Sequence, residues 1–252
     1  MMTLVFDLDD TLLVNPIDQF LPPYFRALTA YLAPYVPTDR LVPELLKATQ
    51  TMMANRDPSR TNEHVFAAHF YPALGLNEAD VRPIIDRFYE DEFPKLQRYT
   101  AVVPEARPLL VAARERGYDL VIATNPVFPL RAIQHRLAWA GLGDVPFRFI
   151  TSYETMHYTK PHPEYYHEIT SAIKCTPADC LMVGNDLGND ILPAKAAGLR
   201  TFWVTAASVL PPASIPDVGI MDVAAAEVAR AEVADYQGTL ADLRRLIEMG
   251  RV

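Results

Sequence analysis

Cysteine is scarce in this chain of 252 residues, which contains only two, Cys175 and Cys180. They form neither the paired pattern of a zinc site nor a disulfide framework, which favours a reducing compartment. We expect each of them to be a small buried apolar residue. The six histidines show no clustering of the kind that binds metals.

Long apolar runs and clusters of positive charge are also missing. No segment approaches the roughly 18 continuous apolar residues that a membrane span requires. The amino terminus lacks the positive flank of a signal peptide. The formal net charge is -8 and lysine and arginine are scattered, which disfavours a nucleic-acid backbone or an anionic membrane as the main partner. We therefore expect a cytoplasmic protein that binds neither nucleic acid nor a membrane.

Half of the residues are apolar, enough for one sizeable core or for a core with a smaller companion domain. After Pro104 the pattern alternates between strands and helices, which predicts a parallel α/β sheet in a Rossmann-like, three-layer core. The expected strands are Thr3 to Phe6, Asp119 to Ala123, Arg148 to Ile150, Cys180 to Val183, Thr201 to Val204 and Glu232 to Tyr236. A proline-rich surface loop is expected at Leu210 to Pro216.

The segment between the first strand and Pro104 has a different pattern. From Asn15 to about Val103 no strand is predicted, but apolar residues recur at helical spacing in four places. The four stripes are Leu21, Tyr24, Leu28 and Tyr31; Leu41, Leu45, Thr49 and Met52; Val65, Phe66, His69 and Phe70; and Val81, Ile84, Ile85 and Phe88. The sequence therefore predicts an all-α domain, residues 16–103, inserted into a core made of residues 1–15 and 104–252.

Acidic residues crowd the end of the first strand, where an open parallel sheet binds its ligands. Asp7 and Asp9 are two residues apart and can face the same crevice, and Thr11 follows them. Crowded carboxylates repel one another and lose solvation unless a cation or a function compensates. The alternative interpretation is an acidic turn with helix-capping residues.

Three further polar sites follow later strands. Thr124 and Asn125 can hold phosphate oxygens, although such residues also favour ordinary turns. Lys160 precedes Pro161, which we expect to start a helix and to fix the lysine at the beginning of that helix. Most lysines in this setting, however, are simply solvated. Asp186 and Asp190 follow Val183 and Gly184 and are close enough to share a cation. Helix capping is their alternative role.

Together and in this order, the four sites resemble the motifs of the haloacid dehalogenase superfamily. The phosphatases of that family have Asp-x-Asp-x-Thr after an apolar strand, then a Thr, a Lys and an acidic pair after Gly. The matching residues here are Asp7, Asp9 and Thr11, then Thr124, Lys160, and Asp186 with Asp190. The resemblance covers residues 1–15 and about 104–240, and the inserted helices resemble the helical cap of the family. Many members have Asp at the position of Asn185, so we expect Asp186 to supply the metal ligand instead, with Asn185 as the alternative.

The resemblance implies a Mg²⁺-dependent phosphatase that hydrolyses a small organic phosphate monoester. Asp7 would attack phosphorus to form an aspartyl phosphate, and Asp9 would act as general acid and then general base. Lys160 would neutralise charge, and Thr124 and Asn125 would hold phosphate oxygens. The expected metal site comprises Asp7, Asp9 through its carbonyl, Asp186 and, nearby, Asp190.

Two alternatives stay open at this stage. A phosphomutase would use the same catalytic residues, and a noncatalytic binding protein could retain the fold. Arg56, Arg60 and His64 form either a second anion site or a solvated loop. Phe88, Tyr89 and Phe93 are expected in the core of the helical segment. The sequence leaves the physiological substrate and the oligomeric state open.

Overall fold

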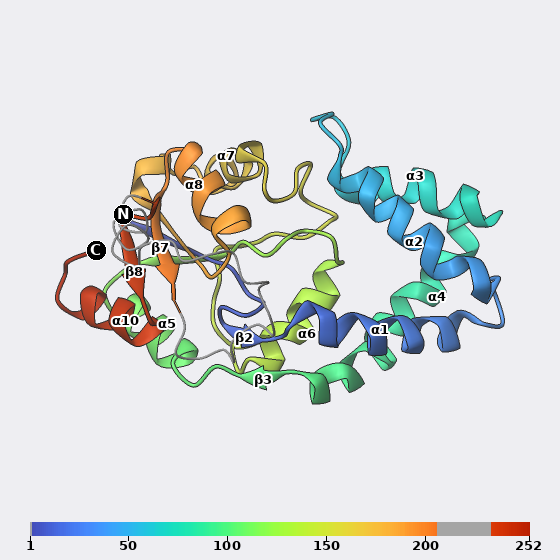
Figure 1. The fold of residues 1–252 in the computed structure, drawn as a ribbon, viewed down its shortest axis with the longest axis horizontal. Coiled ribbons are helices and arrows are strands. Elements are labelled where there is room, and N and C mark those ends of the chain that lie inside the picture. Colours follow the sequence, from blue (N-terminus) through green and yellow to red (C-terminus); the bar gives the residue numbers. More distant parts are fainter. Residues whose placement is uncertain (1, 206–232) are drawn as a thin grey trace, which may run out of the picture.

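The computed structural model describes residues 2–205 and 233–252, and in them a six-stranded, fully parallel sheet forms the centre of the fold (Figure 1). The strand order is β5-β4-β1-β6-β7-β8. The strands are β1 (Thr3–Phe6), β4 (Asp119–Ile122), β5 (Phe149–Ile150), β6 (Cys180–Gly184), β7 (Arg200–Val204) and β8 (Tyr236–Gly238). From β1 the chain adds β4 and β5 on one side, and then β6, β7 and β8 on the other side. The carboxyl ends of β4, β1 and β6 therefore border the crevice where such sheets bind ligands.

Helices cover both faces of this sheet. The alternation of β1 sends Leu4 and Phe6 to one face, where they join a core with α5 (Ala106–Glu115), α6 (Leu130–Trp139) and α10 (Leu240–Glu248). Val5 points to the other face and packs with α7 (Pro163–Ala172) and α8 (Leu192–Ala196). The predicted Rossmann-like three-layer α/β fold is confirmed.

Four helices lie beyond one end of the sheet, to the right of it in Figure 1. They are α1 (Ile17–Leu32), α2 (Thr38–Met53), α3 (Asn62–Leu74) and α4 (Glu78–Asp91), and a 3-10 helix, Phe93–Tyr99, follows. Each predicted stripe contributes buried residues, among them Tyr24, Leu28, Leu41, Phe70 and Phe88. Phe88, Tyr89 and Phe93 are buried and pack ring against ring, as predicted. The boundaries 16–103 of a separate domain stay a prediction.

A short strand pair corrects the prediction that no strand occurs between Asn15 and Val103. β3 (Ala101–Val102) pairs antiparallel with β2 (Leu13–Val14), where the chain leaves the core and returns to it. Two residues are too few to show an alternating pattern, so the sequence does not reveal this pair.

Three smaller predictions have mixed outcomes. The last strand begins at Tyr236 rather than ending there, and Glu232 and the loop Leu210 to Pro216 lie outside the described residues. Cys180 is buried, whereas Cys175 is only partly buried. Within residues 2–205 and 233–252, no helix has both the length and the apolar character needed to cross a membrane.

Candidate functional site

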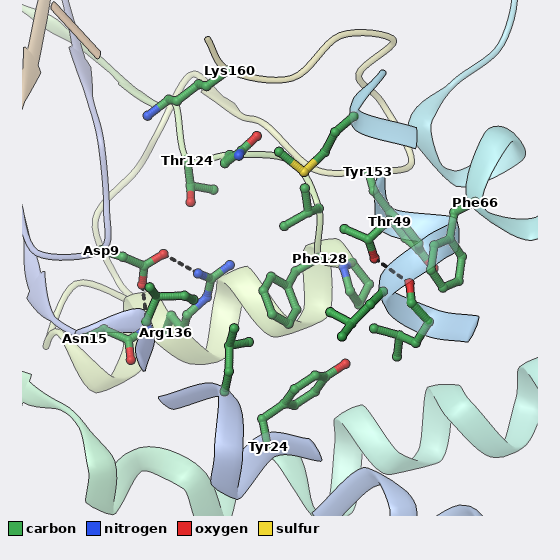
Figure 2. A pocket seen from close by; sticks show the side chains of 18 of the residues that line it. Asp9, Asn15, Tyr24, Thr49, Phe66, Thr124, Phe128, Arg136, Tyr153 and Lys160 are labelled. Atoms are coloured by element: carbon green, nitrogen blue, oxygen red, sulfur yellow. Dashed lines mark hydrogen bonds and ion pairs between the residues drawn. The ribbon is translucent and has the colours of Figure 1, made fainter. Parts of the chain in front are cut away.

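One cavity of about 480 Å³ opens at the carboxyl ends of the central strands and is lined by all seven site residues predicted from the sequence. These are Asp7, Asp9, Thr124, Asn125, Lys160, Asp186 and Asp190. Figure 2 shows Asp9, Thr124 and Lys160 at one end of this cavity, and Thr49 and Phe66 of the helical segment at the other. The cavity therefore extends from the sheet to the four helices.

Asp7 is the first residue after β1, and its position is fixed from three directions. Its backbone N–H donates to the carbonyl of Val183 in β6, 2.9 Å away. Its Oδ1 accepts from Lys160 Nζ at 2.7 Å, and its Oδ2 lies 3.1 Å from the hydroxyl of Thr11. Burial raises the pKa of Asp7 to about 7, although the charge of Lys160 opposes this. The carboxylate therefore depends on nearby positive charge to stay ionised.

Lys160 is buried, which excludes the solvated alternative. Its Nζ also donates to Asp190 Oδ1 at 2.6 Å, so the ammonium bridges two carboxylates, one directly after β1 and one in the helical turn that follows β6. Burial alone would lower the pKa of Lys160, but the charges of Asp190 and Asp7 outweigh it and hold that pKa well above its usual value. Lys160 therefore presents a fixed positive charge beside Asp7.

Asp190 approaches the backbone of β6 so closely that only glycine fits there. A Cβ at Gly184 would overlap with Asp190 Oδ2 and would lie 2.6 Å from the Cβ of Asp190. That same oxygen accepts from the backbone N–H of Asp186 at 3.0 Å. Gly184 therefore allows the carboxylate of Asp190 to reach Lys160.

Asp186 caps the helical turn that follows β6, which was the alternative role for this residue. It accepts from the backbone N–H groups of Gly188 and Asn189 at 2.7 and 2.9 Å, and from the Asn189 side chain at 2.9 Å. Burial opposes the effect, but these hydrogen bonds lower the pKa of Asp186. The carboxylate is thus ionised and fixed at the edge of the cavity.

The oxygen atoms around Thr11 suit a hard cation. The Thr11 hydroxyl lies 3.1 Å from Asp7 Oδ2 and 3.0 Å from Asn185 Oδ1, so these two oxygens converge, with Asp186 next in the chain. Carboxylate and amide oxygens are the ligands that Mg²⁺ prefers. Among the described residues, however, no three His, Cys, Asp or Glu side chains are already grouped for a metal. The donor set therefore fits through Asp186, Asn185 and the Oδ2 atom of Asp7, which faces Thr11 rather than Lys160. The carboxylates of Asp9 and Asp190 are turned toward Arg136 and Lys160.

Asp9 is held by two side chains that sequence reasoning missed. Its Oδ1 accepts from Asn15 Nδ2 at 2.7 Å, and its Oδ2 forms an ion pair with Arg136 (Figure 2). Arg136 lies on α6, and its guanidinium sits 5.0 Å from the centre of the Phe128 ring.

The signal for Arg136 was present in the sequence. Arg136 is buried on the same helix face as Ile133 and Leu137, and a charge within an apolar stripe requires a partner. Its Nη1 meets Asp9, while its Nε and Nη2 are buried without a partner among the described residues. The helical pattern indicates that the arginine is buried, but it does not identify Asp9 as its partner.

Thr124 and Asn125 line the turn after β4. The carbonyl of Thr124 accepts from the hydroxyls of Thr151 at 2.8 Å and Tyr165 at 2.7 Å, which fixes the turn. The side-chain oxygen of Asn125 is buried and has no partner within the described part of the chain. Both side chains border the cavity at the end where Lys160 and Asp7 lie.

The polar break between α2 and α3 lies elsewhere. Arg56 is exposed and contacts His162. In the part of the chain that the structure describes, the cavity lining does not include Arg56, Arg60 or His64. The solvated-loop interpretation of these residues is therefore the better one.

Comparison with known proteins adds independent information. A family model described as haloacid dehalogenase-like hydrolase matches residues 1–198. A phosphoglycolate phosphatase of Haemophilus influenzae is 28% identical over 200 residues, which span 79% of this chain and 84% of that protein. A phosphoserine phosphatase of Thermus thermophilus is 31% identical over 129 residues, 51% of each chain. The crystal structure of a HAD phosphatase from Thermococcus onnurineus aligns over 100% of both chains, with a TM-score of 0.58 and 20% identity, and shares the fold.

Proposed function

Because the chain belongs to the haloacid dehalogenase-like hydrolases, we propose that it is a Mg²⁺-dependent phosphatase that transfers a phosphoryl group first to Asp7 and then to water. The observation that carries this proposal is the position of Asp7, buried at the sheet end of the cavity with Lys160 on one carboxylate oxygen and Thr11 on the other. The activities of the two relatives, phosphoglycolate phosphatase and phosphoserine phosphatase, support the reaction class.

Asp7 is the nucleophile in this proposal. One of its carboxylate oxygens bonds to phosphorus while the bond from phosphorus to the ester oxygen breaks, giving an aspartyl phosphate. Lys160 holds the carboxylate in orientation and offsets the negative charge of the phosphate. Thr124 and Asn125 line the same end of the cavity and bind the non-bridging phosphate oxygens. The Thr124 hydroxyl and the side-chain N–H groups of Asn125 would be the donors in this role.

Asp9 moves the protons. It donates one to the departing ester oxygen and then accepts one from the water that hydrolyses the aspartyl phosphate. Asn15 and Arg136 fix its two oxygens, so it is held at the cavity edge. To act as an acid, Asp9 must first take up a proton, which one carboxyl oxygen can carry while Arg136 still donates to the other, Oδ2.

Mg²⁺ would be held by Asp7, Asp186 or Asn185, and the carbonyl of Asp9, with Asp190 nearby. When bound, it supplies positive charge that neutralises the phosphate oxygens. Asp190 instead keeps Lys160 in position through its 2.6 Å ion pair.

Removal of divalent cations is expected to abolish hydrolysis. With p-nitrophenyl phosphate as substrate, EDTA should reduce the rate to background, and excess Mg²⁺ should restore it. The reason is that Lys160 alone cannot neutralise a phosphate dianion beside the carboxylates of Asp7 and Asp186. Full activity in EDTA, after the metal content of the protein has been measured as zero, would contradict the proposal.

Arg136 is expected to act as a positioning residue for Asp9. Arg136→Met should lower kcat/KM for an alkyl phosphate by about 10- to 100-fold, because the misplaced acid no longer protonates the alkoxide. The loss should be smaller for p-nitrophenyl phosphate, because p-nitrophenolate leaves without a proton and kcat/KM reports the first step.

The matched control is Arg131→Met on the same helix. Arg131 is exposed and pairs with Glu90, so both substrates should be unaffected. Equal losses on the two esters in Arg136→Met would indicate a structural role only and would contradict the positioning role.

A further inference from the structure

The far end of the cavity has a different chemistry from the sheet end. The four helices supply Leu21 and Leu28 from α1, Leu45 from α2, Phe66 from α3 and Ile85 from α4. None of the described residues of α1 to α4 that line the cavity carries a charge or an imidazole. A bound alcohol group therefore meets a wall of aliphatic and aromatic side chains (Figure 2).

Three polar groups of this wall already have hydrogen-bond partners. The Thr49 hydroxyl donates to the carbonyl of Leu45 in its own helix, at 2.9 Å. The hydroxyls of Tyr24 and Tyr89 lie 3.0 Å apart and form a buried hydrogen bond. These three groups do not offer an open site for a charged substituent.

The cations of the cavity are also committed. Among the described lining residues these cations are Lys160, held by Asp7 and Asp190, and Arg136, held by Asp9. The remaining Arg136 nitrogens Nε and Nη2 are buried, so a ligand reaches them only if the side chain moves. A substrate carboxylate at the helical end would thus lose its solvation without gaining a cation.

We propose that the alcohol part of the substrate is uncharged and apolar, an aryl or medium-length alkyl group, and that it binds between α1–α4 and Phe128. This inference rests on the proposed phosphatase function and names its substrate class. It separates this chain from the phosphoglycolate and phosphoserine phosphatases that it resembles, because phosphoglycolate and phosphoserine both carry a carboxylate. An apolar cavity of roughly 150 Å³ holds benzene, so the ≈ 480 Å³ here has room for a phosphate with such a group.

A series of esters tests this substrate class on the full chain with Mg²⁺. From methyl to hexyl phosphate, kcat/KM should rise by about fourfold for each methylene that is buried, until the cavity is full. Isobutyl phosphate has nearly the shape of phosphoglycolate but no carboxylate, and it should be the better substrate of the two by at least about tenfold.

Variants in the wall locate the effect. Phe66→Ala should lower kcat/KM for phenyl and hexyl phosphate by about tenfold or more, and should lower it less for methyl phosphate. Phe66→Leu provides a milder substitution should the alanine variant not fold. The control is Tyr35→Leu, an exposed aromatic residue just after α1, which should leave every ester unchanged.

The outcomes distinguish the two proposals. If p-nitrophenyl phosphate and all the alkyl esters stay intact, the phosphatase function itself is contradicted. If the esters are hydrolysed but phosphoglycolate is preferred to isobutyl phosphate, or chain length has no effect, the function stands and the apolar substrate class is overturned.

Discussion

Asp7→Asn is expected to lower kcat for p-nitrophenyl phosphate by at least about 10³-fold, because an amide cannot attack phosphorus in place of the carboxylate. Asparagine has nearly the same size as aspartate and can still contact Lys160 and Thr11, so the fold should persist. The rate is measured with saturating Mg²⁺ at neutral pH, with circular dichroism as the check on folding.

Asp18→Asn is the control for this substitution. Asp18 is an exposed acid in the first turn of α1 and does not itself line the cavity. It should retain full activity. An Asp7→Asn protein that keeps more than about a tenth of the native rate would show that another group carries the phosphoryl transfer.

Lys160→Met is expected both to remove activity and to destabilise the protein by about 3–5 kcal/mol, the typical cost of breaking a buried ion pair. The ammonium neutralises two carboxylates, Asp7 and Asp190, that methionine would leave buried and facing each other. The free energy of unfolding is measured by urea denaturation, and the rate with p-nitrophenyl phosphate.

A double-mutant cycle separates the contributions of charge and of packing to stability in the cluster of Asp7, Lys160 and Asp190. Asp190→Asn removes one of the two carboxylates, so Lys160→Met should cost clearly less stability in that background than in the native chain. Activity should stay low in the double variant, because Asp7 still lacks its cation. Equal costs in the two backgrounds would mean that Lys160 stabilises the fold through packing rather than through charge.

Much of the fold and of the catalytic end of the cavity could be predicted, because local rules specify them. The apolar run before Asp7 and the one before Gly184 each predict a buried parallel strand, and parallel strands end at one edge of the sheet. That rule brings Asp7 and Asp190 to the same edge of the sheet, where Lys160 bridges them. Their proximity follows from topology, which the alternation of strands and helices predicts.

Other features depend on three-dimensional contacts that no local pattern encodes. The stripe on α6 predicts that Arg136 is buried but cannot name Asp9, which lies 127 positions earlier, as its partner. The helical stripes on α1 to α4 predict buried faces, yet the same apolar residues can fill a core or line a cavity. Asp186 could equally cap a helix or bind a metal from its sequence position, and in the structure it accepts the capping hydrogen bonds.

Trapping of the phosphorylated enzyme tests the central claim most directly. In Asp9→Asn, p-nitrophenyl phosphate should still phosphorylate the protein, because its leaving group needs no acid, while hydrolysis of the intermediate lacks its general base. Rapid mixing followed by acid quench and peptide mass analysis should then find one phosphoryl group on Asp7, formed with one equivalent of p-nitrophenolate. Continued turnover of the native enzyme, with no phosphoryl group on Asp7 in either protein, would contradict the account.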